Sequence, residues 1–363
     1  MGKVEAFQKK KLLIVDDSAF MRKLIADFFE GHPTIQVVGI ARNGKDALTK
    51  ISHLQPDVIT LDIEMPEMDG LQALKAIMEE HPIPVVMLSS MTKAGADATL
   101  KAMEYGAFDF VAKPSGTISL DLHRVRDDLI EKVVAGSEAK VSKLKKVEKA
   151  VRESGLQKPK PALPSRPNPF LHGRKKLVVI GTSTGGPRAL QTVLSGISAD
   201  IDAPILIVQH MPPGFTKSLA ERLNQICSIH VKEAEHGELV KRGTAYIAPG
   251  GFHMKIKVVG SALSLYLDGD EPPRGGHRPA VDVLFESVSF IGKDLIAVIM
   301  TGMGADGTKG LRQMKSRNNV VAIAESQQTC IVYGMPKSAV ESNLVDDVVD
   351  LENIAKTIMK YLP

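Results

Sequence analysis

The stretch Val179-Ile180-Gly181-Thr182-Ser183-Thr184-Gly185-Gly186-Pro187 predicts a strand that turns sharply into a helix. The apolar run that ends at Ile180 is typical of a short buried strand. Glycines surround a single serine, and Pro187 suits the first turn of a helix. Such a turn lifts the Ser183 hydroxyl above the carboxyl end of a sheet and directs backbone N–H groups toward it. Ser183 is therefore a candidate nucleophile.

The composition indicates a globular protein of two domains. The chain has 363 residues, of which 44% are hydrophobic, and no apolar run approaches the roughly eighteen residues of a membrane span. The N-terminus shows no apolar segment typical of a signal peptide. Two cysteines, Cys227 and Cys330, cannot build a disulfide framework or a four-cysteine zinc site. We expect a cytoplasmic protein with reduced thiols and without membrane insertion.

The positive charge of the chain is concentrated in one segment. Residues 140–176 contain twelve lysines or arginines and two glutamates, whereas the net charge of the whole chain is only +4. The remainder is therefore net acidic, which argues against a nucleic-acid groove spread over a domain. Prolines recur in the same segment, so residues 137–175 are predicted to be an exposed, semi-stiff basic linker. Docking of this linker to an acidic partner is a less favoured alternative to simple solvation.

Residues 10–136 alternate between short apolar runs and amphipathic stretches, which predicts a parallel sheet with helices on both faces. The pattern fits a flavodoxin-like (βα)5 domain of strand order 2-1-3-4-5. The predicted strands are Lys11–Val15, Val37–Ala41, Val58–Leu61, Val85–Leu88 and Phe108–Ala112, and the predicted helices lie near 18–31, 43–53, 70–80, 94–105 and 121–135.

Acidic residues follow two of these strands. Asp16 and Asp17 come after the first strand, and Asp62 closes the third, which should be its neighbour in the sheet. Three carboxylates in one pocket are costly unless a cation lies among them. An oxygen-only ligand set suits Mg²⁺. Ser89 could hydrogen-bond a phosphoryl group on Asp62, and Lys113 could neutralise it.

These residues carry a family resemblance. With Asp16-Asp17, Asp62, Ser89, Lys113-Pro114 and Phe110 in register, residues 10–136 resemble a response-regulator receiver domain. The resemblance implies Mg²⁺-dependent phosphorylation of Asp62 by a histidine kinase. It also implies that Phe110 occupies an aromatic switch position.

From residue 176 onward the alternation of strands and helices resumes, which predicts a second α/β domain, doubly wound and mainly parallel, over residues 176–363. The predicted strands are 177–181, 204–208, 244–248, 295–300 and 320–324, with extra strands near 254–259 and 262–267. The predicted helices lie near 187–195, 215–226, 280–291, 305–316 and 351–361.

A serine needs a base to become a nucleophile, and the sequence offers several. His210 and Asp306 each follow a predicted strand, as Ser183 does, and side chains at that edge of an open sheet converge on one crevice. His277 and His253 are rival bases, and Asp282 is a rival carboxylate. Each residue also has a structural interpretation: a turn in a phosphate loop for Ser183, a domain-edge histidine for His210, or a helix cap for Asp306.

The order Ser183, His210, Asp306 differs from that of α/β-hydrolases, in which the acid precedes the histidine. The segments instead resemble the protein-glutamate methylesterase family of bacterial chemotaxis. The matching stretches are Gly181–Gly186, Gln209–Phe215, Gly276–Phe285 and Thr301–Gly307. A receiver joined by a linker to a catalytic domain is that family's arrangement.

The resemblance implies a nucleophilic Ser183, His210 as general base and Asp306 as the orienting carboxylate. Backbone N–H groups of Met303 and Thr184 would hold the oxyanion. The implied substrates are glutamate methyl esters and glutamines of methyl-accepting chemotaxis receptors, with the chemotaxis histidine kinase as phosphodonor. The unphosphorylated receiver would restrict access to the crevice. No cofactor is expected for the esterase reaction itself.

Two other classes of function remain as alternatives. A DNA-binding response regulator would fit the receiver and the basic linker, but its output domain should carry a helix-turn-helix. A nucleotide-binding output would use residues 181–187 as a phosphate loop. That segment lacks both the Gly-x-Gly-x-x-Gly pattern and the Lys-Ser/Thr of a P-loop.

Overall fold

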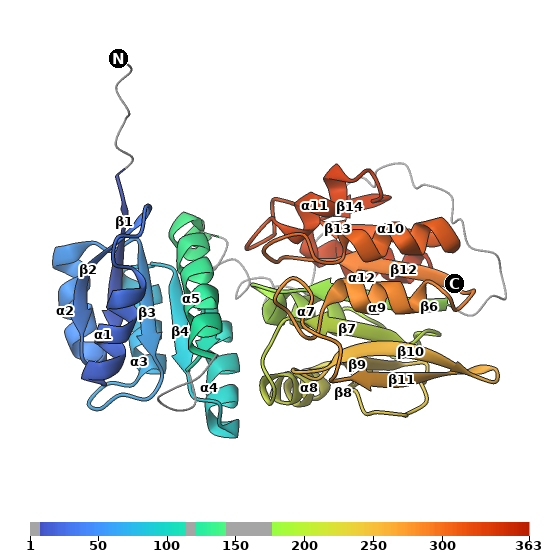
Figure 1. Cartoon of the computed structure of the whole chain (residues 1–363), viewed down its shortest axis with the longest axis horizontal. Coiled ribbons are helices and arrows are strands. Elements are labelled where there is room, and N and C mark those ends of the chain that lie inside the picture. Colours follow the sequence, from blue (N-terminus) through green and yellow to red (C-terminus); the bar gives the residue numbers. More distant parts are fainter. Residues whose placement is uncertain (1–7, 114–120, 143–175, 363) are drawn as a thin grey trace, which may run out of the picture. The chain divides into compact units, whose positions relative to one another are not determined.

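Two separate parallel sheets organise the chain, one before residue 150 and one after it (Figure 1). The computed structural model describes residues 8–113, 121–142 and 176–362. The chain divides into the units Met1–Lys149 and Ala150–Pro363. Most of the predicted linker, residues 143–175, lies outside the described residues, as does Pro114.

The first unit has the predicted strand order, β2-β1-β3-β4-β5, and every pairing is parallel. Strands β3 and β4 are buried along their whole length because helices cover both faces of the sheet. The strands are β1 Lys10–Val15, β2 Ile35–Ala41, β3 Val58–Asp62, β4 Val85–Ser89 and β5 Asp109–Ala112.

Helices α1 and α5 lie together on one face of this sheet, and α2, α3 and α4 cover the other. Four of the five begin at a polar side chain that accepts a backbone N–H, which is the usual start signal of a helix. The helices are α1 Ala19–Phe28, α2 Gly44–Leu54, α3 Gly70–Glu80, α4 Lys93–Glu104 and α5 Asp121–Glu138. Helix α5 thus continues past residue 136, the predicted domain boundary.

The second unit contains a seven-stranded sheet of order β14-β13-β12-β6-β7-β9-β8, again entirely parallel. Strand β6 lies between β12 and β7, so the segments that follow these three strands emerge side by side. The strands are β6 Lys176–Thr182, β7 Ile205–Gln209, β8 His230–Glu233, β9 Thr244–Ile247, β12 Asp294–Ile299, β13 Val320–Glu325 and β14 Asp347–Val349. The α/β fold class predicted for both units is confirmed.

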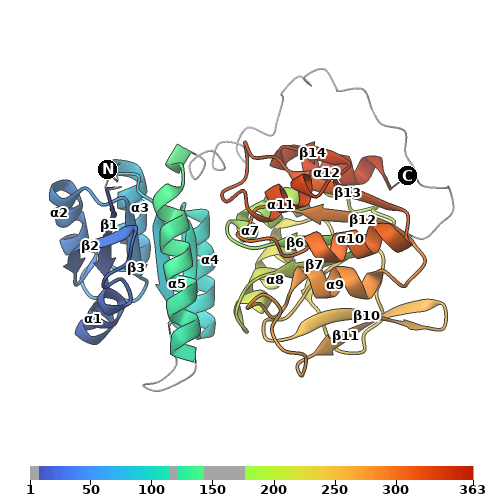
Figure 2. The same ribbon diagram turned by 45° about the horizontal axis from the view of Figure 1, so that its top comes forward.

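The two extra strands predicted in this unit form a separate antiparallel hairpin, β10 His253–Val259 with β11 Ala262–Asp268. The hairpin lies beside α9, Val281–Val288 (Figure 2). Ser287 Oγ of α9 accepts the Ile256 N–H of the hairpin at 3.2 Å. This contact matters for the site because the chain between β11 and α9 carries His277.

The remaining helices are α7 Gly186–Ser195, α8 Phe215–Ile226, α10 Thr308–Arg317, α11 Met335–Glu341 and α12 Leu351–Lys360. Helix α7 contacts both α8 and α12, and α10 contacts both α9 and α11. Helix α10 begins three residues later than predicted because Gly307 has a φ of +94°, which a helix cannot adopt. Helix α9 ends at Val288, before the predicted end near residue 291, and Ser289 is its C-terminal cap.

Candidate functional site

The turn that carries Ser183 follows β6 directly and depends on two glycines. Gly185 has a φ of +77°, and a Cβ there would lie 2.7 Å from Ile331. A Cβ at Gly186 would lie 1.9 Å from Gln209 Oε1, so no side chain fits. Helix α7 begins at once, and the Gly186 N–H donates to the Ser183 carbonyl at 2.7 Å. Ser183 is therefore held, half-buried, at the carboxyl end of the sheet.

His210 follows the neighbouring strand β7, and its ring connects Ser183 with Asp306. Nδ1 lies 3.2 Å from Ser183 Oγ, and Nε2 lies 2.8 Å from Asp306 Oδ2. A carboxylate only accepts, so Nε2 carries the ring hydrogen and Nδ1 is free to accept the serine hydroxyl. In the serine-protease template the two nitrogens have the opposite roles. The arrangement provides a continuous path for a proton from the hydroxyl to the imidazole.

Asp306 is held by the first N–H groups of α9. Its Oδ2 accepts the Val281 N–H at 2.7 Å, and its Oδ1 accepts those of Asp282 at 2.8 Å and Gly307 at 2.9 Å. Burial opposes ionisation of Asp306, but the hydrogen bonds from His210 and the backbone outweigh it and lower the pKa. The carboxylate is therefore charged at neutral pH and can stabilise a protonated His210.

The three rival residues lie around the site and not in the relay. The His277 ring stacks on the His210 ring, with 3.9 Å between centroids and 11° between planes. Buried His253 accepts the Ala280 N–H at Nδ1 and donates to the Pro272 carbonyl from Nε2. Asp282 Oδ1 accepts the N–H groups of Gly307 and Gly310, which fixes the start of α10 to α9.

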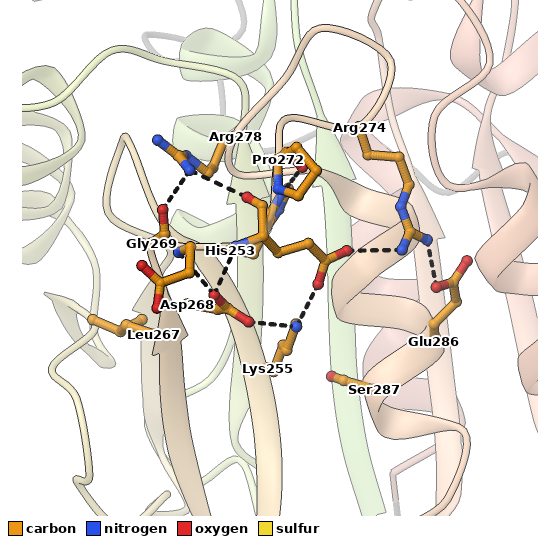
Figure 3. A network of polar contacts seen from close by, with 12 residues as sticks. His253, Lys255, Leu267, Asp268, Gly269, Pro272, Arg274, Arg278, Glu286 and Ser287 are labelled. Atoms are coloured by element: carbon orange, nitrogen blue, oxygen red, sulfur yellow. Dashed lines mark hydrogen bonds and ion pairs between the residues drawn. The ribbon is translucent and has the colours of Figure 1, made fainter.

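The chain segment that carries His277 is tied down by a polar network (Figure 3). Lys255 on β10 binds Asp268 and Glu271, and Arg274 joins Glu271 to Glu286 on α9. Arg278 donates to the carbonyl of Glu271 at 3.1 Å. The network links both ends of the loop to β10 and α9, so the ring that stacks on His210 rests on a restrained segment.

The candidate oxyanion donors are the backbone N–H groups of Met303 and Thr184. The serine's own N–H is occupied by the Thr301 carbonyl at 3.0 Å. Gly302 packs so closely that a Cβ there would lie 2.8 Å from Ser183 Cβ. The next N–H, that of Met303, has no hydrogen-bond partner among residues 8–113, 121–142 and 176–362. Thr184 is buried at the start of the turn.

The acidic pocket of the first unit brings Asp16, Asp17 and Asp62 together, with one carboxylate oxygen of each within 4.8 Å of the others. Lys113 Nζ lies 2.9 Å from Asp16 Oδ2 and 2.8 Å from Asp62 Oδ2. Burial raises the pKa of Asp62 to about 6, although Lys113 acts in the opposite direction. Clustered carboxylate oxygens are the donors that Mg²⁺ prefers, so the residues fit this ion.

The two predicted switch residues are both buried. Ser89 Oγ donates to the Gly95 carbonyl of α4 at 3.0 Å, so it would have to exchange this bond for one to a phosphoryl oxygen. Phe110 is 3% exposed on β5, and its carbonyl accepts from Lys132 Nζ at 2.7 Å. Ser89 Oγ is therefore hydrogen-bonded to the backbone of α4, and the Phe110 side chain is packed inside the domain.

Comparison with known proteins identifies the family of this chain. Residues 178–358 match the family model described as CheB methylesterase, and residues 12–123 match the response regulator receiver domain. The protein-glutamate methylesterase/protein-glutamine glutaminase of Halalkalibacterium halodurans is 55% identical over 96% of this chain and 97% of its own. The chain belongs to the CheB methylesterase family.

Other relatives of this CheB chain support the same assignment. The protein-glutamate methylesterase/protein-glutamine glutaminase of Geobacillus kaustophilus is 54% identical over 97% of this chain and 98% of its own. The crystal structure of the Thermotoga maritima CheB methylesterase catalytic domain matches with a TM-score of 0.50 and 46% identity, over 51% of this chain and 98% of that one. The chain is accordingly a hydrolase with a receiver domain.

Sequence reasoning missed two residues of this CheB chain that hold the backbone of the candidate site in place. Gln209 Nε2 donates to the carbonyls of both Ser183 and His210, at 3.0 and 3.1 Å. Buried Glu325 accepts the Thr301 N–H at 2.8 Å. The position of Gln209 beside His210 was a possible signal. Nothing in the sequence pointed to Glu325, because only the sheet order brings the end of β13 beside the end of β12.

Proposed function

We propose that this chain is a phosphorylation-regulated esterase and amidase of chemotaxis. It removes methyl groups from glutamate methyl esters of methyl-accepting chemotaxis receptors, releasing methanol, and deamidates receptor glutamines. The observation that carries the proposal is the hydrogen-bonded series Ser183–His210–Asp306. Support for the substrate comes from the names of full-length relatives about half identical to this chain.

The reaction begins when Ser183 Oγ attacks the ester carbonyl carbon while His210 Nδ1 takes the hydroxyl proton. Asp306 stabilises the resulting imidazolium through Nε2. The N–H groups of Met303 and Thr184 receive the negative charge on the carbonyl oxygen. His210 then returns its proton to the departing methoxide, which leaves as methanol.

Deacylation uses the same groups in reverse. His210 takes a proton from water, the hydroxide attacks the acyl-enzyme, and Ser183 leaves with the proton, which yields glutamate. A glutamine side chain follows the same route, with ammonia as the first leaving group. Ester and amide differ only in that group, so one site serves both reactions.

Regulation is assigned to the acidic pocket of the first unit. Asp16, Asp17 and Asp62 would hold Mg²⁺, which when bound neutralises charge on the transferred phosphoryl group. Asp62 accepts that group from the chemotaxis histidine kinase, and Lys113 pairs with it. Ser89 and Phe110 then change their contacts, which raises the esterase rate by a shift of population.

We propose a cytoplasmic location for this protein and no nucleic-acid partner. Cys227 and Cys330 are both free thiols, as expected in a reducing compartment. Among the described residues, no helix combines the length and hydrophobicity needed to cross a membrane.

The test is methanol release from methylated receptor membranes by the full chain, with and without a small phosphodonor and Mg²⁺. S183A should release none yet still accept phosphate at Asp62, and D62N should keep its basal rate but gain nothing from the phosphodonor. Methanol release by S183A at the wild-type rate would reject the nucleophile. Equal rates with and without phosphodonor would reject the regulation.

A further inference from the structure

Thr301 lies between the nucleophile turn and Met303, and its backbone is fixed on both sides. The residue follows β12 and is 1% exposed. Its N–H donates to Glu325, and its carbonyl accepts from the Ser183 N–H at 3.0 Å and from Thr182 Oγ1 at 2.9 Å. The chain directly after β12 is thus hydrogen-bonded to the backbone of Ser183.

The Thr301 hydroxyl joins the same region a second time. Oγ1 lies 2.9 Å from the Thr184 carbonyl and 3.3 Å from the Val332 carbonyl, and it accepts the Val332 N–H at 3.0 Å. A hydroxyl has one hydrogen, so the shorter contact, to Thr184, is the donated bond. The hydroxyl therefore connects the nucleophile turn, the loop that begins at Thr301 and the segment at Val332.

The segment at Val332 in turn fixes the peptide before Met303. The Gly302 N–H donates to the Val332 carbonyl at 3.1 Å, and the Gly302 carbonyl accepts from Gly334 at 3.1 Å and Met335 at 2.8 Å. Gly302 also packs against Ser183, with no room for a side chain. The position of the Met303 N–H relative to Ser183 thus depends on contacts that meet at Thr301.

We propose that Thr301 is a positioning residue whose hydroxyl sets the distance between the Ser183 nucleophile and the Met303 N–H. The inference rests on the proposed esterase function and adds a residue that touches no substrate. An oxyanion donor acts only when it lies about 2.7–3.1 Å from the developing charge. A displacement of about 1 Å at such a site costs on the order of 100-fold in rate.

The test compares two substitutions in the full chain. T301V keeps the branched shape and removes the hydroxyl, which leaves the Thr184 carbonyl and the Val332 N–H without this partner. T301S keeps the hydroxyl and loses only a methyl group. For methanol release from methylated receptor membranes, we expect kcat to fall about 10- to 100-fold in T301V, with KM little changed. T301S should stay within about threefold of wild type.

A second readout does not depend on the receptor. A phosphonylating reagent directed at serine forms a tetrahedral adduct whose oxygen needs the same donors. Its rate of reaction with Ser183 should fall in T301V by a factor similar to that in kcat. A residue that only stabilised the fold would lower the melting temperature and leave the reaction rate per folded molecule unchanged.

The inference would be overturned if T301V kept the wild-type kcat and phosphonylation rate per folded molecule. It would also be overturned if T301V and T301S lost these rates to the same extent. If T301V does not fold, T301A takes its place against T301S, with the same outcomes. If the wild-type chain reacts with the phosphonylating reagent but releases no methanol, the proposed substrate is wrong, and the reagent still tests Thr301.

Discussion

Replacing Asp306 with asparagine should stop catalysis by reversing the tautomer of His210. The carboxylate accepts four N–H groups: three from the backbone and one from His210 Nε2. An amide offers only one oxygen. Each carboxylate oxygen accepts two N–H groups, but both donors at Oδ1 are backbone groups that cannot change, whereas one of the two donors at Oδ2 is His210, which can change its tautomer. We therefore expect the amide oxygen at the Oδ1 position and the NH2 group in place of Oδ2. There it donates to Nε2, which moves the ring hydrogen to Nδ1, the nitrogen that faces Ser183.

The magnitude follows from the loss of the base. With a hydrogen on Nδ1, His210 cannot take the serine proton, and the corresponding change in serine proteases lowers kcat about 10⁴-fold. That factor corresponds to about 5.5 kcal/mol of transition-state stabilisation. The Val281 N–H also loses its acceptor, which should cost about 1–3 kcal/mol of folding stability.

The assay is methanol release by D306N beside D282N, with thermal denaturation of both. Asp282 is the matched control because it is a neighbouring carboxylate that also accepts backbone N–H groups, those of Gly307 and Gly310, but does not contact the His210 ring among the described residues. We expect D306N and D282N to lose similar amounts of folding stability, but D306N to lose far more of its kcat. A D306N enzyme that keeps more than about a tenth of wild-type kcat would refute the tautomer argument.

Further predictions concern the turn, a buried acid and the acidic pocket. G186A places a methyl group 1.9 Å from Gln209 Oε1, so thermal denaturation should show a loss of about 1–3 kcal/mol and methanol release should fall at least about tenfold. Burial raises the pKa of Glu325 to about 7, so its contribution to stability is present at low pH and is lost as pH rises through 7. We therefore expect the free energy of unfolding of E325Q, measured by urea denaturation, to rise relative to that of wild type by up to about 3 kcal/mol between pH 5 and 8. A difference that stays constant with pH would contradict this. Mg²⁺ at about one hundred times its Kd should stabilise the wild-type receiver by about 2.7 kcal/mol, and a similar gain in D16N or D62N would argue against the site.

The sequence predicted most of what depends on buried parallel strands. Continuous apolar runs predicted the five strands of the first sheet and the central strands of the second, because such strands are covered on both faces. The order β2-β1-β3-β4-β5 came from the doubly wound fold type that the alternation of strands and helices indicated. Strand β8, His230–Glu233, has only one buried residue and lies at a sheet edge, so no apolar run marked it. Strand β14 has only three residues, too few for a recognisable pattern.

The candidate site was predictable only in part, because strand ends indicate which residues converge but not how their side chains point. Ser183, His210 and Asp306 were chosen on that ground. His277 and His253 were also candidate bases in the sequence. Only the structure shows that the His277 ring stacks on His210 and that His253 accepts the Ala280 N–H, whereas His210 faces the Ser183 hydroxyl. Nothing in the sequence indicates which ring nitrogen of His210 faces Ser183.

That ring direction has a consequence for covalent labelling. Alkylating reagents designed on the serine-protease template are directed at the imidazole nitrogen that faces the serine there, Nε2, which is the one farther from the main chain. Here that nitrogen is bonded to Asp306, and the inner nitrogen faces the alcohol. Such reagents would meet a blocked position, so an active-site label for this enzyme has to be designed around the serine oxygen.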